Sequence, residues 1–152
     1  MKHKFLLDEN ILYEAVKLID LHGNPDPTSA ELVRFIRENC HRLALDRELA
    51  GRYIDHLSRL QEDPARKMEP LDFVKEFIMN SSKRAWESTK GVTIPPDAKI
   101  PPEDLHIARL ALVSKALVVT SEKKLREAIN HYPPLRSTAL TPHEALRLAR
   151  EK

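Results

Sequence analysis

Short apolar segments alternate with longer amphipathic segments along this sequence, and that alternation restricts the fold more than any other feature. Residues 4–7, 42–45 and 116–120 are apolar runs of strand length, the last of them rich in β-branched residues. Residues 47–60 between them show the spacing of an amphipathic helix. Strands separated by helices pair in parallel and are covered on both faces. The pattern therefore predicts an α/β fold, a single three-layer α/β/α domain over residues 1–152 with a central parallel sheet.

The remaining segments follow from spacing and from turn residues. We expect further helices over residues 11–19, from Thr28 with Glu31, over 71–86, from Asp104 to Ser114, over 122–129, and from Thr141 with Glu144 to Arg150. The two Thr–Glu pairs each have the spacing of a capping box. The polar segment 61–70 and the proline-rich segment 91–102 predict loops, and 137–140 predicts a last short strand.

Composition excludes several classes of protein. The single cysteine, Cys40, allows no intrachain disulfide and favours a reducing, cytoplasmic location. The apolar stretch at the start of the chain is too short for a signal-peptide core or a membrane span. A net charge of +2 neither demands nor excludes a polyanionic partner. No glycine-rich phosphate loop is present, and the histidines lack the paired spacing of a zinc site.

Three acidic residues follow predicted strands or begin predicted helices. Asp8 follows the first strand, Asp104 begins a helix, and Glu122 comes shortly after the 116–120 strand. The carboxyl ends of parallel strands lie on one rim of a sheet, where ligands bind in open α/β folds. Carboxylates gathered there repel one another unless a cation neutralises them, and oxygen-only ligands suit Mg²⁺ or Mn²⁺. The placement predicts a metal site built from Asp8, Asp104 and Glu122.

Each acid also has a simpler interpretation. Asp104 is well placed to cap a helix, and Glu122 in a first helical turn suits the helix dipole. Taken singly, these two are better explained in that way, and Asp8 is harder to dismiss. His106, close to Asp104 in sequence, could line the same rim, although a surface histidine is the simpler expectation. The joint placement of all three acids is what favours the metal interpretation.

Four sequence motifs resemble those of the PIN domain family. They are the opening strand and acid in Phe5–Leu12, the acid-bearing helix start in Pro101–Ala108, the strand end in Leu117–Glu122, and the strand-to-helix turn in Leu140–Leu146. Each motif alone is weak, but their order and spacing span nearly the whole chain. The resemblance implies a central parallel sheet, an acidic pocket and a Mg²⁺- or Mn²⁺-dependent ribonuclease, and many small prokaryotic members are VapC-type toxins of toxin–antitoxin pairs.

The sequence departs from the family pattern at two of its acids. Glu122 stands where the family usually has Asp, which keeps the charge on a longer arm. Arg52 stands where the family carries its second acid, and Glu48, one turn earlier, is the candidate substitute. An arginine beside Asp8 and Asp104 would occupy the place of a cation and weaken metal binding. The alternative is that Arg52 points to solvent and pairs with Glu48 at i, i+4 spacing.

Basic residues near these motifs are candidates for contacts with RNA phosphates. They are Lys123, Lys124, Arg126, Lys83 and Arg84. For any one of them, a solvated helix face without a partner is an equally good explanation.

The sequence thus predicts a metal-dependent endoribonuclease with Asp8, Asp104, Glu122 and Glu48 as its catalytic residues, either a toxin or an RNA-processing enzyme. The alternative is a PIN-fold module that binds RNA or protein with weak or lost catalysis. An antitoxin protein and a second copy of the chain are the further expected partners.

Overall fold

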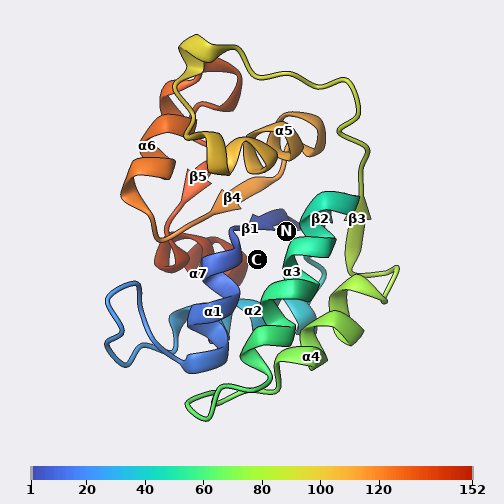
Figure 1. Ribbon diagram of the computed structural model, residues 1–152, viewed down its shortest axis with the longest axis vertical. Coiled ribbons are helices and arrows are strands. Elements are labelled where there is room, and N and C mark those ends of the chain that lie inside the picture. The colour runs from blue at the N-terminus through green and yellow to red at the C-terminus, as the bar shows by residue number, and fades with distance from the viewer. Residues whose placement is uncertain (1, 152) are drawn as a thin grey trace.

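The computed structural model describes residues 2–151, which form a three-layer α/β/α domain around a sheet of five parallel strands (Figure 1). The strands lie in the order β3-β2-β1-β4-β5. Their bounds are β1 (Lys4–Leu7), β2 (Arg42–Leu45), β3 (Arg84–Trp86), β4 (Leu117–Val119) and β5 (Ala139–Leu140). The predicted fold class is therefore confirmed.

Helices cover both faces of this sheet. Their bounds are α1 (Glu9–Lys17), α2 (Thr28–Glu38), α3 (Arg47–Leu60), α4 (Pro70–Phe73), α5 (Leu105–Ser114), α6 (Lys123–His131) and α7 (Pro142–Arg150). α1 to α4 and α7 lie on one side of the strands, where α2 packs against both α1 and α7, whereas α5 and α6 lie on the other side (Figure 1). Short 3-10 turns at Pro96–Ala98, Pro102–Asp104 and Pro133–Leu135 lie in the connections between elements. Within residues 2–151, no helix is long and apolar enough to cross a bilayer.

β1 is the central strand and forms the middle of the core. Phe5, Leu6 and Leu7 are completely buried, because helices cover both faces of the sheet and the strand needs apolar side chains on each. The buried Tyr53 of α3 packs edge-on against Phe73, and its hydroxyl donates a hydrogen bond to the carbonyl oxygen of Leu7. That bond fixes α3 against the carboxyl end of β1.

The register of the strands aligns their carboxyl ends. Leu7 pairs with Val119, and Leu45 pairs with Trp86. The residues that follow these strands therefore come out at one rim, and the Asp8 amide donates to the carbonyl oxygen of Val119 at 3.0 Å. This rim is where the sequence placed its candidate acids.

The prediction of one helix over 71–86 is wrong. α4 continues as a π-helical turn, Val74–Ile78, and a turn at Asn80 then leads into β3. The Asn80 side chain accepts hydrogen bonds from the amide and hydroxyl of Ser82, which is how such residues stop helices. Residues 84–86 are extended because they pair with β2, a tertiary contact that overrides their local preference.

One of the two predicted capping boxes is also wrong. Thr28 lies inside α2, whose N-cap is Pro27, and Thr28 donates its amide and hydroxyl hydrogens to the carboxylate of Asp26. Asp26 therefore takes the role expected of Thr28. The box at Thr141 is confirmed, with reciprocal bonds to Glu144 of 3.0 and 3.1 Å.

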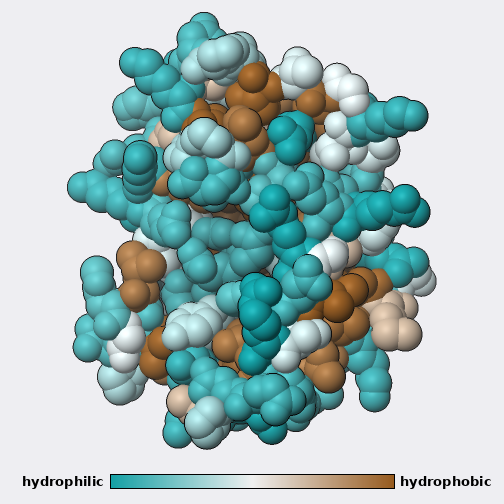
Figure 2. Space-filling view, in the orientation of Figure 1, coloured by the Kyte–Doolittle hydropathy of each residue, from teal (hydrophilic) through white to brown (hydrophobic). Residues whose placement is uncertain are grey.

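Hydrophilic side chains cover most of the face drawn in Figure 2, and hydrophobic ones gather over α4 at the lower right. Leu71 and Met79, both exposed, belong to the chain segment in and after α4. A groove of about 460 Å³ lies close by and is lined by residues of α1, α2, α3 and α4.

Candidate active site at the carboxyl rim of the sheet

Asp8 is the most buried acid of the rim. It leaves β1 with extended backbone angles and begins α1, but its side chain does not cap that helix. The residue is 3% exposed, and its Oδ2 accepts a 2.8 Å hydrogen bond from the Thr120 hydroxyl. Burial raises the pKa of Asp8 to about 8; the Thr120 bond opposes this shift, and the Glu9 and Glu122 charges add to it. The protonated form of Asp8 is therefore favoured relative to that of an exposed aspartate.

Glu9, the next residue, has the opposite electrostatic character. Its Oε1 lies 2.8 Å from Nε2 of His106, whose ring is buried at the start of α5. Burial acts to raise the pKa of Glu9, but the hydrogen bond and charge of His106, with a hydrogen bond from Asp8, lower it to about 2. The environments of Asp8 and Glu9 thus shift their pKa values in opposite directions, upwards for Asp8 and downwards for Glu9.

Asp104 and Glu122 belong to the same electrostatic neighbourhood. Asp104 is 8% exposed and occupies the N-cap position of α5, but its side chain makes no capping hydrogen bond. Burial raises the pKa of Asp104 to about 6, and the charges of Glu122, Glu103 and Glu9 add to the shift. Glu122 accepts a 2.8 Å bond from the Asn10 amide, which joins the end of β4 to the start of α1. The negative charges of Glu9 and Glu122 therefore raise the pKa values of both Asp8 and Asp104.

Glu48 and Arg52 form an exposed pair on α3. Arg52 Nη2 lies 3.1 Å from Glu48 Oε1, and about half of each side chain is exposed. Arg109 of α5 approaches the other Glu48 oxygen at 3.6 Å. The hydrogen bond from Arg52 lowers the pKa of Glu48 against a smaller effect of burial, and the charges of His106, Arg52 and Arg109 add to the shift. Arg52 is thus engaged with Glu48, as the second of the two alternatives predicts.

The predicted RNA-binding residues differ in whether their side chains already make hydrogen bonds within the protein. Lys83 donates to the carbonyl oxygens of Ile36, Asn39 and His41 at the end of α2, and Arg84 donates to the carbonyl oxygen of Ile78 at 2.6 Å. Both are part of the fold's own hydrogen bonding.

The other three lie on α6. Lys123 is mostly exposed and approaches Glu127 at 3.8 Å, and Lys124 is exposed. Arg126 donates to the Thr120 carbonyl oxygen at 2.9 Å, so part of its guanidinium is engaged at the rim.

Two residues of the rim were missed or undervalued by sequence reasoning. Glu9 was passed over because it adjoins Asp8, and a residue next to an acid at a strand end gives no signal of its own. His106 was expected at the surface, and the structure corrects this: it is 4% exposed and bonded to Glu9. Their spacing of 97 residues hides the pair from any local pattern.

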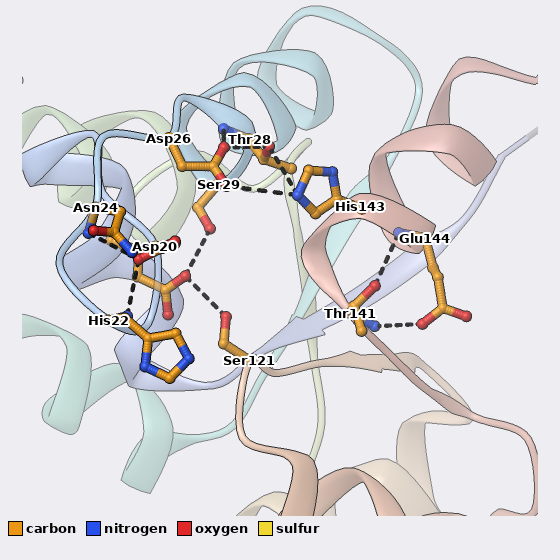
Figure 3. Close-up of polar contacts among 11 residues, drawn as sticks. Asp20, His22, Asn24, Asp26, Thr28, Ser29, Ser121, Thr141, His143 and Glu144 are labelled. Atoms are coloured by element: carbon orange, nitrogen blue, oxygen red, sulfur yellow. Dashed lines mark hydrogen bonds and ion pairs between the residues drawn. The ribbon is translucent and has the colours of Figure 1, made fainter.

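A second polar pocket adjoins the acids through Ser121. Ser29 and Ser121 both donate to Oε1 of the buried Glu14, at 3.3 and 2.8 Å (Figure 3). Burial raises the pKa of Glu14 against these bonds. His143 of α7 lies 3.5 Å from Asp26, at the other side of this 240 Å³ pocket. The Glu14 carboxyl thus ties α1 and α2 to the end of β4.

The donor chemistry of the rim fits Mg²⁺ or Mn²⁺, because its carboxyl and amide oxygens are hard ligands. Its present arrangement does not: among residues 2–151, no three His, Cys, Asp or Glu side chains are gathered closely enough to hold a metal ion. Burial raises the pKa of Asp8, and Glu9 is turned to His106. An ion at this site would have to displace a proton and draw the carboxylates together.

Comparison of this chain with protein-family models, with curated proteins and with solved structures found no match.

Proposed function

We propose that this protein is a metal-dependent endoribonuclease of PIN type. The observation that carries the proposal is the buried Asp8 at the carboxyl rim, bonded to Thr120 and with its pKa raised by burial and by the charges of Glu9 and Glu122. The charge of Glu122 likewise raises the pKa of the buried Asp104. A buried carboxyl with a pKa near 8 costs the fold stability at neutral pH, and such groups are concentrated at functional sites. The resemblance of the four sequence motifs to the PIN family supports the same assignment.

The chain's own residues prepare this rim for a cation. Asp8, Asp104 and Glu122 would hold Mg²⁺ or Mn²⁺, and the ion would supply an activated water and stabilise charge on a phosphodiester. Thr120 orients Asp8, Asn10 orients Glu122, and His106 holds Glu9 as a carboxylate. The proton on Asp8 must leave when a cation binds, so binding is expected to tighten as pH rises.

RNA is the proposed substrate, and a cytoplasmic location goes with the single cysteine. An antitoxin protein and a second copy of the chain remain the proposed protein partners, as the family resemblance implies. The mostly exposed lysines of α6, Lys123 and Lys124, are the basic side chains nearest in sequence to Glu122 and available for phosphates.

A specific observation favours a second candidate, a PIN-fold binding module with little catalysis. Within the described part of the chain the rim acids form no three-ligand group, and burial raises the pKa of Asp8, which opposes its ionisation. A site that held this arrangement in the presence of divalent ions would bind RNA without cutting it.

The deciding experiment measures cleavage of a mixed-sequence RNA with Mn²⁺, with Mg²⁺ and with EDTA, together with the melting temperature at each ion concentration. The proposal expects cleavage with either ion, none with EDTA, and loss of both cleavage and ion-dependent stabilisation in Asp8→Asn. Glu62→Gln, at an exposed acid outside the rim, is the matched control and should behave as the natural protein. RNA binding without cleavage at any ion concentration selects the binding module.

A further inference from the structure

Trp86 is a large exposed aromatic side chain at the carboxyl end of an edge strand. It is the only tryptophan of the chain, and 52% of it is exposed. β3 lies at one edge of the sheet, so one side of the strand has no neighbour. The Arg84 guanidinium lies 5.6 Å from the ring centroid, a cation–π distance. An exposed indole offers a flat apolar face on which a planar ligand group can stack.

A groove of about 590 Å³ opens beside this ring. It is formed by the end of β2, the start of α3 and the segment after β3, and it is lined by Asp46, Arg47, Glu48, Trp86, Glu87, Ser88, Thr89 and Lys90. The volume lies within the ~300–1,000 Å³ that ligand sites commonly have. The Thr89 hydroxyl donates to Asp46 Oδ2 at 2.9 Å and so holds the segment after β3 against the rim.

The three carboxylates that line this groove already have partners within the protein. Asp46 caps α3 through the Leu49 amide and also accepts from Thr89. Glu48 is paired with Arg52, and Glu87 lies 3.8 Å from the Lys4 ammonium.

The two cations of the groove are available by contrast. Among the described residues, the side chains of Arg47 and Lys90 make no hydrogen bond or ion pair, and both are exposed. The groove therefore presents an aromatic face beside two unengaged positive charges, which complements a base linked to phosphates.

The position of Trp86 relative to the rim acids follows from the sheet. Leu45 pairs with Trp86, and Phe5 pairs with Leu43, so the ends of β3, β2 and β1 are level. Neighbouring strands lie about 4.8 Å apart, which puts Trp86 on the order of 10 Å from Asp8 along the rim. A single strand lying across the rim could therefore reach both within a few nucleotides.

We propose that Trp86, with Arg47 and Lys90, forms a stacking platform for an unpaired base of single-stranded RNA and its adjoining phosphates. The inference rests on the proposed function only in taking RNA as the polymer. Single-stranded RNA is recognised mainly by stacking of unpaired bases on aromatic and arginine side chains, with basic side chains on the backbone. A duplex hides its base faces, so the platform selects unpaired segments as the substrate class.

The sole tryptophan makes the test direct. A short single-stranded RNA is added to the natural protein in EDTA, and the emission of Trp86 is followed. We expect saturable quenching whose midpoint moves to higher RNA concentration as salt is raised. The same sequence as a blunt duplex should quench far less.

Variants tested by anisotropy of a labelled RNA separate stacking from mere exposure. Trp86→Ala should weaken binding about tenfold, while Trp86→Phe, which keeps a stacking ring, should recover most of that loss. Met79→Ala, at another exposed hydrophobic residue, is the matched control and should bind as the natural protein does. Melting temperatures of all three variants verify that they are folded.

Three outcomes overturn the platform. Unchanged emission on addition of RNA overturns it, as does equal affinity of the natural protein and Trp86→Ala. A blue shift on raising protein concentration alone, indifferent to RNA, shows instead that a second copy covers the ring. If metal-dependent cleavage occurs and is the same in Trp86→Ala, the proposed nuclease function is supported and the stacking platform is rejected. Quenching and a Trp86→Ala loss without any cleavage leave the platform standing and reject the nuclease.

Discussion

Nε2 of His106 lies 2.8 Å from Oε1 of Glu9, and this contact joins the start of α5 to the start of α1. Both side chains belong to helix starts that lie against the same rim. The contact lowers the pKa of Glu9, whereas burial raises the pKa of the neighbouring Asp8, so the two carboxyls differ in how readily they ionise. Four predictions follow from this rim and its surroundings.

Removing the imidazole of His106 should change the pKa of Glu9. In His106→Ala the pKa of Glu9 is expected to rise, because the bond and charge that lower it are lost. The free energy of unfolding should fall by about 1–3 kcal/mol, the cost of leaving a buried polar partner unsatisfied. Carboxyl NMR titration and urea unfolding measure the two effects. His131→Ala, at an exposed histidine, is the control; an unchanged Glu9 titration in His106→Ala would contradict the prediction.

Asp8→Asn should stabilise the protein increasingly as pH rises. The pKa of Asp8 is about 8 in the fold against 3.8 for the free side chain, so between about pH 4 and pH 8 the folded chain holds a proton that the unfolded chain releases. The free energy of unfolding must then decrease as pH rises across that window. Asp8→Asn lacks the titrating carboxyl, so it should not show this decrease. We expect Asp8→Asn to gain more than about 1 kcal/mol at pH 8 and little at pH 4.

Urea unfolding at several pH values measures this difference between natural protein and variant. Glu9, whose pKa is lowered to about 2, contributes in the opposite sense: its stabilisation is lost only as pH falls below about 4.5. It therefore does not mask the window above pH 5. Asp97→Asn, at an exposed acid, is the control, and an equal gain at both pH values would rule out the assigned Asp8 proton.

Arg52→Glu should not increase RNA cleavage. Arg52 pairs with Glu48 on the exposed side of α3 and does not occupy the place of a metal at the rim. The expected cost of Arg52→Ala is a few tenths of a kcal/mol, roughly 0.2–0.5. Glutamate at this position also meets like charge from Glu48, so stability should drop slightly further. A marked rise in Mn²⁺-dependent cleavage with Arg52→Glu would show that the arginine does restrain the site.

Replacing Lys83 should reduce stability, whereas replacing Lys124 should reduce RNA affinity. Lys83→Met should destabilise the fold, because the Lys83 ammonium donates to the carbonyl oxygens of Ile36 and His41 at 2.7 and 3.4 Å. Burial also lowers the pKa of Lys83, as expected for an ammonium withdrawn from water. Lys124→Met should leave stability nearly unchanged and reduce both RNA affinity and its salt dependence. Thermal unfolding and filter binding at two salt concentrations distinguish the two; a folded, stable Lys83→Met with weakened RNA binding would reverse the assignment.

The sequence was informative where burial dictates residue type. Residues 4–7 and 117–119 are apolar because both faces of the sheet are covered, and this pattern is visible without any structure. β3 was missed because Arg84, Ala85 and Trp86 show no alternation, and only pairing with β2 makes them a strand.

The candidate site was predictable to a similar extent. Asp8 was found because it directly follows an apolar strand, at the rim where open α/β sheets bind ligands. Glu9 and His106 gave no signal, because what matters is their contact with each other, which exists only once α1 and α5 are packed. The same limit applies to Lys83, whose partners are carbonyl groups at the end of a distant helix.

The central position of β1 has a consequence for the order of folding. β1 pairs only with β2 and β4, so the strand that carries Asp8 is made first but finds its second neighbour more than a hundred residues later. Contacts this distant along the chain form slowly, after local helices. During synthesis the rim stays incomplete until residues 117–122 have emerged. Glu122 can approach Asp8 only after these residues have been made, so the full set of rim acids is assembled late in synthesis.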